Sequence, residues 1–154
     1  MLRTQFTEDL KTSMFDKDKV ATGTLRLIIT AMKDRDIALR GKGNTDGVGE
    51  DEIISMLQTM VKQRRDSVVM YTKGGRDELA AQENAEIVII EKYLPKQMGD
   101  DEVKNAIDTA VSDADATGLK DMGKIMGILK STYNGQMDFG KASGLLKEKL
   151  ASLG

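Results

Sequence analysis

The sequence predicts an all-α protein, with an N-terminal four-helix bundle-like domain followed by a smaller three-helix C-terminal domain. Apolar residues recur at three- and four-residue spacing through most of the chain, which is typical of amphipathic helices. No run shows the strict alternation of apolar and polar residues that predicts a half-buried strand. Pro95, the only proline, interrupts this pattern because proline cannot continue a helix. We therefore place the domain boundary at Pro95–Gly99, between an N-terminal helical domain (1–94) and a C-terminal three-helix domain (95–154).

The first two helices are expected before a glycine-rich loop. Apolar residues recur every four positions at the N-terminus and form one predicted stripe: Leu2, Phe6, Leu10 and Met14. A second helix is predicted from Val20 to about Leu39. The polar segment Gly41–Gly49 follows it and is predicted to be a loop. It lacks the Gly–Lys–Ser/Thr ending of a phosphate-binding loop.

The third and fourth helices have clear start and stop signals. Three acidic residues at 50–52 favour a helix start, because the helix dipole places positive charge there. This helix is predicted to run to about Lys73, where Gly74–Gly75 ends it. The fourth helix is predicted from Asp77 to Leu94.

Three more helices are expected after Pro95. Asp100 or Asp101 is predicted to cap the first, whose apolar face extends from Val103 to Val111. The second carries apolar residues in register from Met122 to Tyr133. A turn over Asn134–Gly140 is predicted before the last helix, which carries its apolar residues from Ala142 to Leu153.

The composition excludes several classes of chemistry. The chain has no Cys and no His, which removes thiolate nucleophiles, disulfides, the commonest general base and the usual nitrogen ligand for metals. We therefore expect no cofactor and no metal. With three Tyr and three Phe, a base-stacking platform is not expected either. No run approaches the roughly 20 apolar residues of a membrane span, so the sequence predicts a cytoplasmic protein with no membrane partner.

The formal net charge is −2, but charge is sorted along the chain. Residues 19–42 carry a net +4 and residues 43–61 a net −4, while residues 120–149 carry a net +3. Such alternation is typical of complementary helix faces within one bundle. Basic patches that bind a polyanion are the alternative interpretation.

Two arginines and two glutamates are candidates for an internal ion pair. Arg64 and Arg65 lie on or beside the apolar face of the third helix, and Glu83 and Glu86 lie on or beside that of the fourth. A planar guanidinium can grip a carboxylate with two hydrogen bonds, so we expect a structural contact between these helices. A role facing a substrate is the alternative.

The segment around residues 120–130 combines glycines with lysines. Gly123 and Gly127 are four residues apart on one predicted helix, where each costs about 1 kcal/mol relative to Ala. Close approach of a neighbouring helix would explain them. The alternative is that a bare backbone admits a nucleic-acid backbone, with nearby lysines attracting its phosphates. The candidate binding residues are Lys120, Gly123, Lys124, Gly127, Lys130 and Lys141.

Four short motifs in this order resemble the GatB/YqeY family, and the resemblance covers roughly residues 1–150. They are Leu25-Arg26-Leu27-Ile28, Lys62-Gln63-Arg64-Arg65-Asp66-Ser67, Tyr93-Leu94-Pro95 and Asp121-Met122-Gly123-Lys124-Ile125-Met126-Gly127. The resemblance implies a small all-helical protein similar to the helical tail of the B subunit of glutamyl/aspartyl-tRNA amidotransferase. In that enzyme the tail holds the tRNA, while other parts carry out the ligase and amidase chemistry.

The resemblance therefore implies a tRNA-binding accessory protein of translation that is not catalytic alone, although the family label is carbon–nitrogen ligase with glutamine as amido donor. The implied partners are tRNA and an aminoacyl-tRNA synthetase or amidotransferase subunit, and DNA is not expected. An adaptor that docks on such a protein without touching RNA is the alternative. One local departure is that Met137 and Phe139 flank Asp138, where the family tends to have small residues. This difference is expected to alter the loop that a tRNA would meet.

Overall fold

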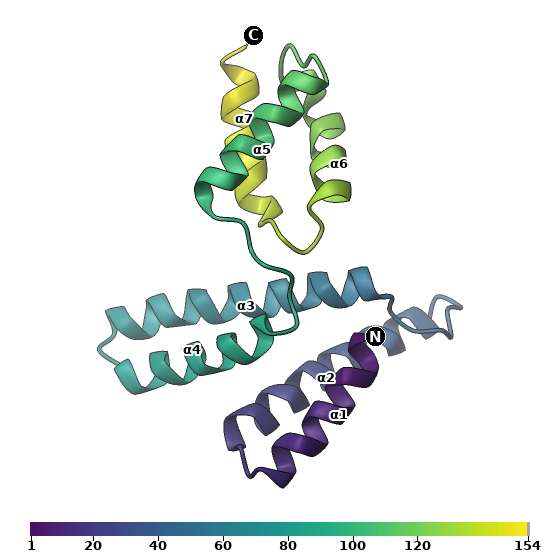
Figure 1. Ribbon diagram of the computed structural model, residues 1–154, viewed down its shortest axis with the longest axis vertical. Coiled ribbons are helices and arrows are strands. Elements are labelled where there is room, and N and C mark those ends of the chain that lie inside the picture. Colours follow the sequence, from purple (N-terminus) through teal and green to yellow (C-terminus); the bar gives the residue numbers. More distant parts are fainter. Residues whose placement is uncertain (154) are drawn as a thin grey trace. The chain divides into compact units, whose positions relative to one another are not determined.

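The computed structural model describes residues 1–153, and these residues form seven α-helices, one short 3-10 turn and no strand (Figure 1). They divide into two compact units, one of residues 1–94 and one that begins at Pro95. Each unit has its own cluster of buried apolar side chains. The all-α fold class is confirmed. Whether each unit is an independently folding domain stays a prediction.

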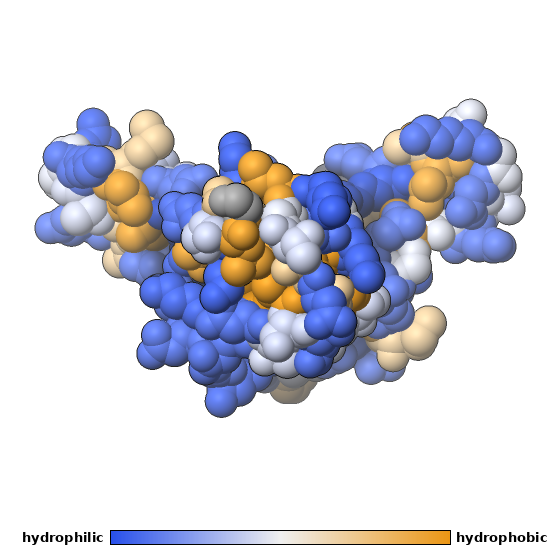
Figure 2. Space-filling model, turned by 90° about the horizontal axis from the view of Figure 1, so that it is seen from above, coloured by the Kyte–Doolittle hydropathy of each residue, from blue (hydrophilic) through white to orange (hydrophobic). Residues whose placement is uncertain are grey.

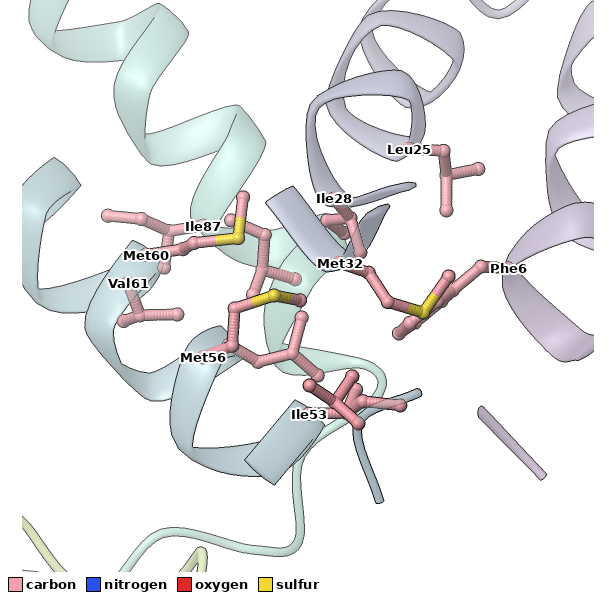
Figure 3. Close-up of a cluster of buried hydrophobic side chains, with 12 residues drawn as sticks. Phe6, Leu25, Ile28, Met32, Ile53, Met56, Met60, Val61 and Ile87 are labelled. Carbon is pink, nitrogen blue, oxygen red and sulfur yellow. The ribbon is translucent and has the colours of Figure 1, made fainter. Parts of the chain in front are cut away.

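The N-terminal unit contains four helices: α1 (Leu2–Phe15), α2 (Lys19–Arg40), α3 (Glu50–Lys73) and α4 (Asp77–Glu91). α1 packs beside α2 and α3 beside α4, and α2 also contacts α3 and α4. Their contact surfaces enclose Phe6 and apolar residues from the other three helices. Figure 3 shows this core, in which the methionines Met32, Met56 and Met60 fill space between aliphatic side chains.

The stripe predicted on α1 is wrong at its last position. Met14 is 51% exposed, whereas Ser13 is buried. Residues four apart on an α-helix are offset by about 40° around its axis. Met14 is three such steps from Leu2, so it lies about 120° away around the helix. Ser13 lies seven residues after Phe6 and so returns to the inner face. Its hydroxyl group donates to the carbonyl of Leu10 at 2.8 Å and is also hydrogen-bonded to the Thr22 hydroxyl at 2.9 Å.

Residues beyond the helix ends hold the unit together. The main chain of α1 begins with the Leu2 N–H donating to the Glu50 carboxylate of α3 at 2.9 Å. α4 ends at Glu91, three residues before the predicted end, and Tyr93 turns back onto α1. The Tyr93 ring meets Phe6 edge-on at 4.9 Å, and its hydroxyl donates to Asp9. Burial, together with the Asp9 carboxylate, raises the pKa of the Tyr93 phenol above its usual range.

The C-terminal unit contains α5 (Asp100–Asp113), the turn η1 (Leu119–Asp121), α6 (Met122–Thr132) and α7 (Phe139–Ala151). The three helices contact one another in every pair around a shared core that includes Ile107, Ile125, Leu129 and Leu146. The N-cap of α5 is Gly99 rather than the predicted Asp100 or Asp101, which lie within its first turn. Here the acids complement the helix dipole instead of capping the main chain.

The first turn of α7 begins inside the predicted turn. The helix starts at Phe139, because the Asp138 carboxylate accepts hydrogen bonds from the N–H groups of Gly140 and Lys141 at 3.0 and 3.2 Å. Gly135, with φ of +79°, makes the preceding reversal of the chain. Figure 2 shows that hydrophobic residues remain visible at several places among the hydrophilic ones that cover this view.

Candidate functional site

The two glycines of α6 face outward. Gly123 and Gly127 are exposed, and a Cβ atom added at either would meet no other atom within 4 Å. The opposite side of α6 carries Ile125 and Leu129, which are buried against the other helices of the unit. The explanation by close helix packing is therefore wrong for the described residues of this unit. The glycines instead leave a strip of bare main chain at the surface.

Lysines lie on both sides of this strip. Along α6, at 100° per residue, Lys124 projects on one side of the line through Gly123 and Gly127 and Lys130 projects on the other, while Lys120 lies in the turn η1 that leads into the helix. All three lysines are exposed, and none of them forms an ion pair with any residue from 1 to 153. We refer to Lys120, Gly123, Lys124, Gly127 and Lys130 as the α6 face.

Asp121 is the acidic residue nearest to this face in sequence, and its carboxylate serves the main chain. It accepts a hydrogen bond from the N–H of Thr117 at 2.8 Å and a longer one from that of Gly118 at 3.4 Å. The hydrogen bond from Thr117 lowers the pKa of the Asp121 carboxyl group, and the positive charges of Lys120 and Lys124 lower it further. Asp121 therefore fixes the turn into α6 and leaves the two ammonium groups free to meet another anion.

Lys141, the remaining predicted binding residue, is not on the α6 face. It lies in the first turn of α7, and its ammonium group pairs with Asp100 of α5. The same contact lowers the pKa of the Asp100 carboxyl group. A second α7–α5 pair joins Lys149 and Asp108 at 3.4 Å. Four of the six predicted residues thus lie on α6 and Lys120 lies in the turn before it, whereas Lys141 connects α7 to α5.

The residues that depart from the family pattern point inward. Met137 is 1% exposed and belongs to the core of the C-terminal unit, and Phe139 packs against that core. Asp138 between them caps α7. The two large side chains therefore fill the interior, and their effect on the loop that a tRNA would meet stays a prediction.

The arginines of the predicted ion pair lie on α3, and the glutamates lie on the neighbouring helix α4. Arg64 Nε donates to Glu86 Oε2 at 2.9 Å, and both side chains are largely buried. Arg65 instead reaches Glu91, at 2.5 Å, in a more exposed position. Glu83 takes part in no ion pair among residues 1–153. Arg64 and Glu86 thus form a largely buried ion pair through one hydrogen bond and not the two expected, and its structural role stays a prediction.

A second charged cluster, which no sequence motif predicts, holds the glycine-rich loop to α1 and α2. Arg3 donates to both carboxylate oxygens of Asp36, at 2.7 and 3.0 Å, and to the carbonyl of Val48 at 3.2 Å. Asp36 also accepts from the Val48 N–H at 2.9 Å. These bonds, with Arg3 as the largest cause, lower the pKa of Asp36 to about 2.

Gly47 is part of this cluster, which we call the Arg3–Asp36–Val48 clamp. A Cβ at Gly47 would lie 2.8 Å from both Arg3 Nη2 and Asp36 Oδ1, and its φ of +87° also favours glycine. The three clamp residues are 12 to 45 positions apart, so no local pattern connects them. The net positive charge of residues 19–42 was the one available hint.

Comparison with known proteins identifies the family. The sequence pattern of the family described as Yqey-like protein matches residues 3–150. The chain belongs to the YqeY-like family. Among curated proteins it is similar to "Altered inheritance of mitochondria protein 41, mitochondrial" of Saccharomyces cerevisiae, with 35% identity over 86 residues. The proteins of the same name from Meyerozyma guilliermondii and Lachancea thermotolerans are 40% identical over 88 residues and 31% identical over 87 residues.

These relatives are longer than the matched part. In each case 56% of this YqeY-like chain aligns, which corresponds to 42–44% of the relative. Their names place them in mitochondria, so the cytoplasmic localisation expected from the sequence stays a prediction. Among residues 1–153, no helix is long and apolar enough to cross a membrane. The same residues contain no cluster of three or more acidic side chains arranged to hold a metal ion.

Proposed function

We propose that this YqeY-like protein is a non-catalytic accessory protein that binds tRNA through the α6 face. The observation that carries the proposal is the bare strip at Gly123 and Gly127, flanked by three lysines without ion-pair partners. Gly127 lies in the interior of α6, where a glycine is less stable than an alanine, and no packing contact within the unit offsets this cost. Close access for the backbone of a partner molecule would explain why glycine stands there despite its cost in stability.

The physical basis is approach distance and charge. Without side chains at positions 123 and 127, a sugar–phosphate backbone can come closer to the helix axis than it could over alanine or larger residues. Lys120, Lys124 and Lys130 would then neutralise phosphates on both sides of the contact line. Such an interface reads backbone shape rather than base sequence, which suits a folded RNA.

The resemblance to the amidotransferase B-subunit tail supports tRNA as the RNA. The motif Asp121–Gly127, which carries part of that resemblance, coincides with the start of the α6 face. In this account the chemistry on the aminoacyl end belongs to a partner enzyme, either a synthetase or an amidotransferase subunit. The YqeY-like chain binds the body of the tRNA.

The test is a binding titration of the full chain with bulk tRNA at two salt concentrations. We expect Lys120→Glu/Lys124→Glu to weaken binding at least tenfold, which is about 1.4 kcal/mol, with an unchanged circular dichroism spectrum and melting temperature. Lys104→Glu/Lys147→Glu is the matched control, because it makes the same charge change at two exposed lysines on α5 and α7.

The control separates a local interface from a general effect of net charge. If both double variants lose affinity equally, the α6 face is not the site. If the wild-type chain has no salt-sensitive affinity for tRNA, the proposal is wrong, and docking on a protein partner without RNA contact becomes the leading function.

A further inference from the structure

A groove of about 500 Å³ lies between α1 and α2 of the N-terminal unit, which run side by side (Figure 1). Its apolar lining comes from Leu10 on α1 and from Ile29, Met32 and Ile37 on α2. This volume is within the range of about 300–1,000 Å³ that is usual for small-ligand sites. The groove is far from the α6 face in sequence and belongs to the other unit.

The charged residues of the groove leave an excess of positive charge. Arg3, Lys33 and Arg40 line it together with one carboxylate, Asp36, so the lining has a net charge of +2. Asp36 is already bound by Arg3 and by the N–H of Val48 in the clamp. Neither Lys33 nor Arg40 forms an ion pair with any described residue, although Arg40 acts on Asp36 at longer range.

The two unpaired cations flank an exposed apolar side chain. Lys33, Ile37 and Arg40 are spaced four and three residues apart, so they share one face of α2. Ile37 is 62% exposed, whereas Met32, which also lines the groove, is buried in the core. A ligand seated here would cover apolar surface and meet two positive charges at once.

We propose that the α1–α2 groove binds a small amphipathic anion, a molecule with a carboxylate or phosphate head and an apolar body. The head would lie between Lys33 and Arg40, and the body along Leu10, Ile29 and Ile37. The Arg3–Asp36–Val48 clamp fixes both helices and the loop at one end, so the site is preformed. This proposal does not depend on the proposed binding of tRNA.

The probes are decanoate and decyl phosphate, each titrated below its micelle concentration into the full-length, ¹⁵N-labelled chain. We expect saturable shifts of amide signals from α1 and α2, with the tighter of the two probes identifying the head group. Acetate lacks the apolar body and decyltrimethylammonium lacks the anionic head, so each should bind at least tenfold more weakly. Equal binding of the cationic amphiphile, or shifts confined to other helices, would overturn the proposal.

A pair of matched variants tests the residues. Lys33→Gln/Arg40→Gln should weaken binding of the preferred probe at least tenfold. Arg35→Gln/Lys42→Gln removes the same charge near the same end of α2 but touches none of the lining, and should bind as the wild type does. All four positions are exposed, so the variants should fold, which the amide spectrum itself verifies. Equal affinity of the two double variants would contradict the assignment.

Discussion

At the scale of single residues, the contact between Arg64 and Glu86 is the most buried of the ion pairs within residues 1–153. The exposed fractions of the two side chains are 13% and 16%, compared with 61% and 36% for Arg65 and Glu91. Arg64 also donates to the carbonyl of Met60 at 3.2 Å. Removing one partner of a buried ion pair strongly destabilises a protein, because the remaining charge is then neither hydrated nor paired.

Arg64→Ala is therefore expected to lower the free energy of unfolding by about 1–3 kcal/mol, since it leaves Glu86 largely buried and unpaired. Urea denaturation of the full chain measures this difference. Arg65→Ala serves as the control, because an exposed pair contributes less than about 1 kcal/mol. Equal unfolding midpoints for Arg64→Ala and wild type would reject the structural role.

Asp36 predicts a pH dependence of stability. Its pKa of about 2 in the folded chain lies below the ordinary value of 3.8, so the folded state favours the ionised form. This contribution is complete above about pH 4 and is lost as the pH falls from there to about 2. Asp36→Asn should consequently flatten the decline in urea midpoint over this interval. An unchanged pH profile would mean that the clamp does not contribute to stability.

Among the helices, α6 contains glycines that lower its stability and carries the proposed tRNA-binding face. In Gly123→Ala/Gly127→Ala the added methyl groups meet no atoms within 4 Å, so the variant should be more stable, by about 0.5–1 kcal/mol at Gly127 in the helix interior and by less at Gly123 in the first turn. The same change should weaken tRNA binding, because two methyl groups then stand on the contact line.

Gly144→Ala on α7 is the matched control for this prediction. Gly144 is also exposed and has open space around its missing Cβ, so the variant should gain stability without losing affinity. Thermal melts and tRNA titrations of the same samples measure both effects. If the α6 double variant gains stability and keeps full affinity, the glycines do not serve RNA binding.

Sequence patterns predict helices well where local signals and packing agree. The predicted bounds of α3 match the structure, because acids favour its start and two glycines follow its end. The end of α4 was predicted three residues too late, since Tyr93 leaves the helix to pack on Phe6, 87 positions earlier in the chain. Contacts between residues far apart in the chain are equally hard to predict at the candidate site. The α6 face is local in sequence, but the pairing of Lys141 with Asp100 joins residues 41 positions apart.

At the scale of the whole molecule, the chain consists of two units that each enclose a separate core. The clamp, the contact between Arg64 and Glu86, and the bond between Tyr93 and Asp9 all lie within residues 1–94. We therefore expect a fragment of residues 1–94 to be helical and to melt cooperatively by circular dichroism. The described residues after Pro95 form a three-helix unit with a smaller core, so a fragment of residues 96–154 is expected to be less stable alone.

Limited proteolysis of the full chain provides the complementary measurement. Cleavage is expected within Gly41–Gly49 and at Pro95–Gly99, which lie between helices. A 1–94 fragment that lacks a cooperative transition would contradict the proposed domain boundary.

The salt dependence of tRNA binding is the sharpest test of whether the α6 face contacts RNA phosphates. Each phosphate neutralised by a lysine contributes about 0.7–0.9 to the slope of log affinity against log salt concentration. We expect Lys120→Gln/Lys124→Gln/Lys130→Gln to reduce the magnitude of this slope by about two to three, and Lys104→Gln/Lys147→Gln to leave it unchanged. A wild-type slope near zero, or the same slope for the triple variant and wild type, would contradict this expectation.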